Sequence, residues 1–203
     1  RFVRLPIASL PWPQNLPLRL LFTGASPSNL YTFDVSSEWA DIETALTPAV
    51  TAGSLKVEAV TPGATLDAVL AELRRGVDLW HFAGHSNGNE LIFCDPHGQV
   101  LAFPANELGR LLAGEGVRLA VLNACRTGAG GGQVASVAGA LVRAGLPGVV
   151  ANQADISDVA ARAFSAAFYD AIAAGQPVDQ AVIAARKAIL AVGSTEWWMP
   201  ALF

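Results

Sequence analysis

The sequence predicts a three-layer α/β protein, in which helices cover both faces of a mostly parallel β-sheet. Two observations predict this class. Short apolar runs typical of strands alternate along the chain with segments of helical periodicity, and the connections between them are short. One β-hairpin interrupts this alternation and is expected to be an insertion. A chain of 203 residues can bury a large core without disulfides or a structural metal.

The first part of the expected domain contains its clearest amphipathic helix. Leu66, Val69, Leu70 and Leu73 share one face of this helix, and Gly76 follows as a signal for its C-terminal end. The elements expected here are, in order, a strand at 18–23, a helix at 38–50 capped by Ser36 or Ser37, a strand at 55–60, a helix at 65–75 and a strand at 77–83.

The hairpin is predicted by strand-like runs at 91–93 and 99–103, which flank the turn sequence Asp95-Pro96-His97-Gly98. After it, the alternation of strands and helices resumes. The remaining expected elements are a helix at 104–113, a strand at 117–122, a Gly-rich loop at 128–132, a helix at 136–144, a strand at 148–152, helices at 158–174 and 178–192, and a short strand at 200–203.

The chain reads as one domain with a short appendage. Residues 1–17 are rich in proline and are expected to be an irregular leader or linker remnant, whereas residues 18–203 form the domain. Because the chain starts with Arg1, we expect it to be part of a longer protein. The remaining part could then hold a targeting or regulatory module.

Composition and charge exclude several classes of function. The net charge is −4 and no cluster of Lys or Arg occurs, so binding to nucleic acid or to an anionic membrane is not expected. Apolar stretches are interrupted well before the ~20 residues that a membrane span needs. The two cysteines, Cys94 and Cys125, lie in different contexts and no signal-like start occurs, which favours a reducing cytoplasm over a secreted disulfide fold.

The candidate active residues follow two strands that should be neighbours. In an open parallel sheet, the functional crevice lies beyond the carboxyl ends of the strands. The strand at 77–83 leads into His85, and the next parallel strand, at 117–122, leads into Cys125. Consecutive parallel strands usually lie side by side, so we expect His85 and Cys125 to emerge together at one edge.

A cysteine beside a histidine suits nucleophilic catalysis. The thiolate attacks a carbonyl carbon while the imidazole manages the proton. Gly84 permits a close approach of the substrate, and the backbone N–H groups of Ser86 and Cys125 could stabilise a developing oxyanion. We therefore predict His85 and Cys125 as the catalytic pair.

Plainer interpretations apply to several of these residues. A lone cysteine is usually a small buried apolar residue, and this interpretation is kept for Cys94 and stays open for Cys125. His81 lies four residues before His85, but on a strand two such histidines need not converge on a metal. The run of glycines at 128–132 is not followed by the Lys-Ser/Thr of a phosphate loop. No metal and no cofactor are expected.

Two motifs resemble those of a known family. The stretch Asp78-Leu79-Trp80-His81-Phe82-Ala83-Gly84-His85 resembles the histidine motif of CHAT domains, which are bacterial relatives of caspases and separases. The stretch Val121-Leu122-Asn123-Ala124-Cys125-Arg126-Thr127-Gly128 resembles their cysteine motif. The similarity extends from about Leu18 to Phe203 and includes the closing Trp198-Met199-Pro200-Ala201-Leu202-Phe203.

The resemblance implies a caspase–hemoglobinase fold, with six strands in the order 2-1-3-4-5-6 and an antiparallel last strand. It also implies hydrolysis of peptide bonds by a Cys-His dyad, with Cys125 as nucleophile and His85 as acid–base group. The substrate would be a protein or peptide. Regulatory or repeat modules, in the rest of the chain or in a partner protein, would control it in bacterial signalling or defence.

The sequence departs from the family at two positions. Ser86 stands where many relatives have glycine, and a positive φ angle there would penalise serine. Asn152 stands where an apolar residue is common. In relatives this strand end borders the pocket for the residue before the scissile bond, so the resemblance implies that Asn152, Gln153 and Asp155 are substrate-binding residues. Asp155 could favour a basic side chain by charge pairing, and Asp158 could do so too, although an N-cap role shared with Ser157 is preferred.

Two other functions stay open. The domain could be a catalytically silent or gated caspase-like module that acts by binding a partner protein, which the serine at position 86 would favour. It could also be a nucleotide-binding doubly wound domain, although no phosphate-binding motif supports this.

Overall fold

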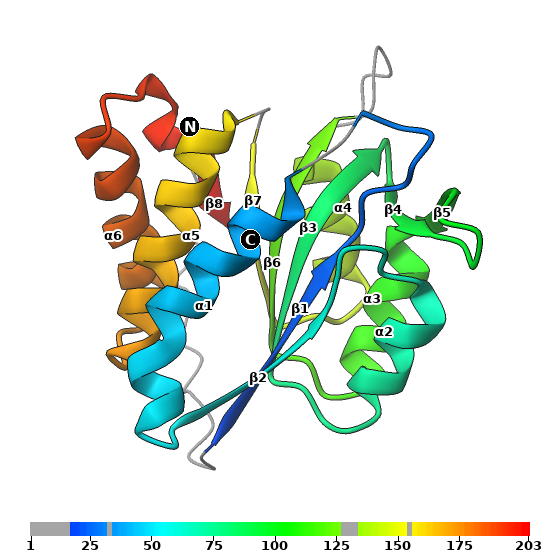
Figure 1. Cartoon of the computed structure of the whole chain (residues 1–203), viewed down its shortest axis with the longest axis horizontal. Helices are drawn as coiled ribbons and strands as arrows, with labels where there is room; N and C mark the ends of the chain where they lie inside the picture. The colour runs from blue at the N-terminus through cyan, green and yellow to red at the C-terminus, as the bar shows by residue number, and fades with distance from the viewer. Residues whose placement is uncertain (1–16, 32–33, 127–133, 154–155) are drawn as a thin grey trace.

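The structure is a computed structural model that describes residues 17–31, 34–126, 134–153 and 156–203, with residues 125, 126, 134 and 135 described by their backbone alone. It has three layers, with one sheet between two groups of helices (Figure 1). The predicted leader at 1–17 lies almost wholly outside the described residues, and so does the Gly-rich loop at 128–132. None of the helices in the described ranges has the length and hydropathy that crossing a membrane requires.

The main path of the sheet follows the order β2-β1-β3-β6-β7-β8. All neighbouring strands on this path are parallel except β8, which runs antiparallel to β7. Counted along the chain without the hairpin, this is the predicted order 2-1-3-4-5-6. The strands are β1 (Leu18–Gly24), β2 (Leu55–Val60), β3 (Leu79–Asn87), β6 (Leu119–Arg126), β7 (Gly148–Asn152) and β8 (Pro200–Leu202).

The predicted hairpin is formed by β4 (Glu90–Cys94) and β5 (Val100–Pro104). Its turn is closed by Asp95, whose Oδ1 accepts hydrogen bonds from the backbone N–H groups of His97 and Gln99, both at 2.8 Å. Gly98 adopts a φ of 74°, which explains a glycine at this turn position. β4 also pairs antiparallel with the end of β3, so the hairpin extends the sheet beside the carboxyl end of that strand.

The helices divide between the two faces of the sheet. α1, α5 and α6 cover one face, and α2, α3 and α4 cover the other (Figure 1). Each face has its own buried apolar cluster, because successive residues of a strand point to opposite sides. The helices are α1 (Val35–Thr51), α2 (Leu66–Leu73), α3 (Ala105–Gly114), α4 (Val134–Arg143), α5 (Asp158–Ala173) and α6 (Val178–Ala191).

Three element boundaries differ from the prediction by three residues or more. β3 and β6 continue four residues beyond their expected ends. His85 is therefore the third residue from the end of β3 and Cys125 the second from the end of β6, and both lie in paired strands rather than in loops. The cause for β3 is the hairpin, which supplies β4 as an additional antiparallel partner. Helix α1 begins earlier than expected, because the side chain of Asp34, and not of Ser36 or Ser37, caps it by accepting from Ser37 N at 3.1 Å.

One short element was not expected. The 3-10 helix η1 (Thr195–Trp198) lies between α6 and β8. Glu196 ties it to the start of α5, because its carboxylate accepts hydrogen bonds from Ser157 N at 2.9 Å and Ser157 Oγ at 2.5 Å. These two bonds and one from Ser194 lower the pKa of Glu196. The element therefore sits beside the carboxyl end of β7.

Candidate active site

The structure brings the backbone of His85 and that of Cys125 side by side. In the parallel pairing of β3 with β6, His85 is the direct register partner of Cys125, and Ala83 is that of Asn123. Both residues lie near the carboxyl ends of their strands, at the edge where open α/β sheets carry their sites. Their expected juxtaposition is therefore found in the backbone, while their catalytic role stays a prediction.

The ring of His85 is buried, with an exposed fraction of 2%, and a backbone oxygen orients it. Its Nε2 lies 2.8 Å from the carbonyl oxygen of Tyr31, a residue just before α1. A carbonyl oxygen can only accept, so Nε2 must carry a proton and donate it. In the neutral ring the lone pair is then on Nδ1, which is the tautomer that allows Nδ1 to act as a base.

The charge state of His85 follows from its burial. Desolvation lowers the pKa of His85 below its ordinary value, and the hydrogen bond to the Tyr31 carbonyl opposes this shift in part. The imidazole is therefore neutral at pH 7. A neutral imidazole with its lone pair on Nδ1 can accept a proton from a thiol, which a charged imidazolium could not do.

Ser86 follows His85 in β3 and is buried. It is paired with Arg126 of β6 on one side and with Leu91 of β4 on the other. No residue other than glycine has a positive φ in the parts of the chain that the structure describes, so serine at this position is not strained. The positive φ that would penalise serine here is absent. The role of the Ser86 and Cys125 N–H groups in an oxyanion hole stays a prediction.

The predicted substrate-binding residues follow β7. Asn152 is its last residue and is buried, with an exposed fraction of 5%. Gln153 is bound to the segment before β8: its N–H donates to Met199 O at 2.9 Å and its Nε2 donates to Trp198 O at 3.2 Å. Asp155 lies outside the described residues. Ser157, not Asp158, provides the side chain that caps α5.

Asn123 is a candidate site residue that the sequence interpretation missed. It lies two residues before Cys125 in β6, beside Ala83, and its exposed fraction is 4%. Neither its Oδ1 nor its Nδ2 has a hydrogen-bond partner among the described residues. Buried polar atoms without partners are rare, since each costs about 1–3 kcal/mol, and they often mark functional sites. The general rule that residues at strand ends deserve attention could have singled it out.

The remaining histidines and the second cysteine have structural explanations. His81 is fully buried and both ring nitrogens have protein partners, Glu38 at 3.0 Å and Tyr169 at 2.9 Å, which disfavours the metal alternative for it. His97 is exposed in the hairpin turn. Cys94 is buried, and burial raises the pKa of its thiol, as expected for an unreactive cysteine.

The architecture is that of caspase-like cysteine peptidases, as comparison with solved structures shows. Gingipain R, described as an Arg-specific cysteine proteinase, matches with a TM-score of 0.63 at 15% identity, over 91% of this chain and 45% of its own. A structure described as a protease matches with a TM-score of 0.64 at 13% identity, over 94% of this chain and 48% of its own. Separase in the Saccharomyces cerevisiae separase–securin complex matches with a TM-score of 0.51 at 16% identity, over 93% of this chain and 12% of its own.

The family is defined by sequence. The CHAT domain family model matches residues 19–200, and the chain belongs to this family. No curated protein is similar enough in sequence to match. The chain spans less than half of the length of each of the three solved structures it resembles.

Proposed function

We propose that this domain is a cysteine endopeptidase that hydrolyses peptide bonds with the dyad Cys125 and His85. One observation carries the proposal: the direct register pairing of the two residues at the carboxyl edge of the sheet. The orientation of the His85 ring by the Tyr31 carbonyl supports it, because it leaves Nδ1 able to accept a proton. Membership of the CHAT family and the peptidase-like fold agree with this chemistry.

The proposed reaction has two stages. His85 Nδ1 takes the proton of the Cys125 thiol, and the thiolate attacks the carbonyl carbon of the scissile bond. As the tetrahedral intermediate collapses, His85 returns the proton to the leaving amine, and a thioester remains on Cys125. A water molecule then attacks the thioester while His85 accepts its proton, and the proton passes to the departing thiolate.

Two sets of groups are proposed to recognise the substrate. The backbone N–H groups of Ser86 and Cys125 would stabilise the oxyanion. Asn152, Gln153 and Asp155 would border the pocket for the residue before the scissile bond. A basic side chain there is the proposed preference, because Asp155 could pair with its charge, and the similar gingipain R is described as specific for Arg.

The test is cleavage of a peptide library by the wild type and by Cys125→Ala. We expect cleavage by the wild type and none by the variant, with unchanged circular dichroism, because the nucleophile alone is lost. Cys94→Ala serves as the matched control and should cleave like the wild type, since Cys94 is buried in the hairpin. Equal cleavage by the wild type and Cys125→Ala would contradict the proposal.

A second prediction concerns Asn123, whose amide we propose to hydrogen-bond with a polar group of the substrate. Asn123→Leu should raise the free energy of unfolding by about 1–2 kcal/mol, because two buried polar atoms without partners are removed. The same change should lower kcat/KM for peptide cleavage about tenfold or more. Chemical denaturation and steady-state kinetics measure the two effects.

Thr61→Val is the control for Asn123→Leu. The hydroxyl of Thr61 is also buried without a partner, but Thr61 follows β2, two strands from His85. The control should gain stability without changing cleavage. A loss of stability in Asn123→Leu would show that the amide makes a hydrogen bond in the free protein.

The second candidate function is a gated module, which the burial of His85 favours. In this state the domain would bind a partner protein and become active only on a signal from a regulatory module. A peptide carrying a thiol-reactive electrophile distinguishes the two. Labelling of Cys125 in the isolated domain supports the active peptidase, and labelling only after addition of a partner supports gating. We place the domain in the cytoplasm, where a thiol stays reduced.

A further inference from the structure

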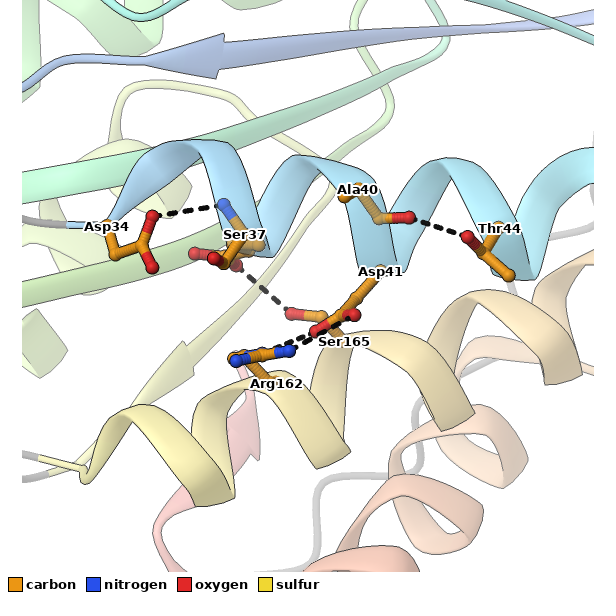
Figure 2. Close-up of polar contacts among 8 residues, drawn as sticks. Asp34, Ser37, Ala40, Asp41, Thr44, Arg162 and Ser165 are labelled. Atoms are coloured by element: carbon orange, nitrogen blue, oxygen red, sulfur yellow. Dashed lines mark hydrogen bonds and ion pairs between the residues drawn. The ribbon is translucent and has the colours of Figure 1, made fainter.

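A buried polar cluster lies on the same face of β3 as His85 but has no part in the proposed chemistry. It consists of Glu38 of α1, His81 of β3, and Ser165 and Tyr169 of α5. His81 Nε2 lies 3.0 Å from Glu38 Oε1, and Ser165 Oγ donates to the same oxygen at 3.1 Å. His81 Nδ1 lies 2.9 Å from the Tyr169 hydroxyl. Figure 2 shows Ser165 of α5 facing α1.

The cluster is enclosed by apolar residues. His81 is fully buried and stacks on Phe22 with a ring distance of 5.1 Å, and Glu38 has an exposed fraction of 2%. Burial raises the pKa of Tyr169 well above its ordinary value and the Glu38 carboxyl group adds to the shift, so the phenol keeps its proton. Such buried ionisable groups stabilise a fold no better than apolar residues of similar shape. Stability alone therefore does not explain the cluster.

Hydrogen bonds are directional and fix the relative orientation of the groups that they join, whereas apolar contacts do not. Glu38 lies in the first turn of α1, and its bond to His81 fixes the rotation and axial position of this turn over β3. The cap of α1 is Asp34, and Tyr31 is three residues before it, within about 10 Å even if the chain is extended. The position of the Tyr31 carbonyl, which orients His85, therefore depends on where α1 begins.

We propose that His81 and Glu38 form a positioning pair, which anchors the start of α1 so that the Tyr31 carbonyl holds His85 in its Nε2–H tautomer. The inference rests on the proposed function for its kinetic consequence but not for its effect on the His85 ring. His81 and His85 of β3 thus have linked roles. His81 fixes the position of α1 through Glu38, and His85 donates a hydrogen bond to the Tyr31 carbonyl oxygen, which lies just before α1.

The test is made on the isotope-labelled domain by long-range proton–nitrogen NMR, which distinguishes protonated from unprotonated ring nitrogens. His97→Gln identifies the signals of His97, and the variant that lacks His81 identifies those of His81, so that the remaining signals belong to His85. The whole cluster is replaced by apolar side chains in Glu38→Leu/His81→Phe/Ser165→Ala/Tyr169→Phe, which leaves no hydroxyl of the cluster without its acceptor and should melt within about 5 °C of the wild type. We expect His85 in this variant to lose its fixed tautomer and to show averaged nitrogen signals.

Two matched variants separate the anchor from general stability. Glu38→Gln keeps an oxygen that can accept from His81 and should retain the His85 signature. Asp41→Asn cuts the neighbouring ion pair of α1 with α5, in which Arg162 Nε lies 2.5 Å from Asp41 Oδ2 (Figure 2), and should also retain it. A changed His85 signature in Asp41→Asn would overturn the proposal, since any loosening of α1 would then suffice.

The kinetic arm uses the same variants. The apolar replacement should lower kcat about tenfold with KM within about twofold, because the base is misoriented while the substrate pocket is intact.

An unchanged His85 signature in the folded replacement overturns the inference. If the replacement does not fold, Ser165→Ala, which removes one bond to Glu38, decides: broadened His85 signals support the inference and an unchanged signature overturns it. If the wild type cleaves no peptide, the proposed function fails and the NMR arm alone decides.

Discussion

His85→Ala should lower kcat/KM for peptide cleavage by about 10³-fold or more, with the fold retained. General acid–base catalysis by a positioned side chain contributes about 10²–10⁴-fold, and here the same ring would serve both stages of the reaction. The fold should tolerate the change because alanine fits the strand and the neighbouring backbone pairs of β3 with β4 and β6 are kept. Steady-state kinetics and thermal denaturation measure both effects.

His97→Ala is the control, since His97 is exposed in the hairpin turn and should leave cleavage unchanged. The pH dependence gives a second check on the wild type. Burial lowers the pKa of His85, and the base must be neutral to accept a proton, so kcat/KM should fall only as the pH drops below 6.5. A limb centred at or above 6.5 would contradict the neutral dyad.

Much of the fold could be predicted because local signals and packing agree. The alternation of strands with helices predicts a parallel sheet, and the sheet order was implied by the resemblance to CHAT domains. The ends of β3 and β6 could not be predicted in the same way. Their extension depends on pairing with β4 and with each other, which is a contact between distant parts of the chain and leaves no local pattern.

The candidate site could be predicted only where its chemistry requires a particular type of side chain. His85 and Cys125 could be placed together from the rule that neighbouring parallel strands end at the same edge. The partner of His85 could not, because it is a backbone carbonyl, which every residue possesses. The contact between Glu38 and His81 could not be predicted either, because each residue alone looks like an ordinary polar residue. Only the packing of α1 on β3 shows that they meet in the core.

Gly84, the residue before His85, is required because a side chain does not fit there, and not because its backbone has a positive φ angle. A Cβ atom at Gly84 would lie 2.6 Å from the carbonyl oxygen of Ala25 and 3.1 Å from the ring of Phe82. The carbonyl cannot simply move away. Ala25 N donates to Ala83 O at 2.9 Å, and Ala25 also forms a bridge with Gly63.

Gly84→Ala should therefore lower the free energy of unfolding by about 2–3 kcal/mol, as overpacking of a rigid interior does. For a chain of this size the melting temperature should drop by roughly 4–12 °C. Cleavage should suffer more than stability. A strand displaced by even ~1 Å beside His85 misplaces the base, which can cost about 10²-fold in rate.

Gly114→Ala is the matched control for this change. Gly114 ends α3, its φ is not positive, and a Cβ there would meet nothing within 4 Å, so alanine should be neutral or slightly stabilising. If Gly84→Ala melted and cleaved like this control, β3 would have room to move beside β1. The rigid placement of His85, on which the proposed dyad depends, would then be wrong.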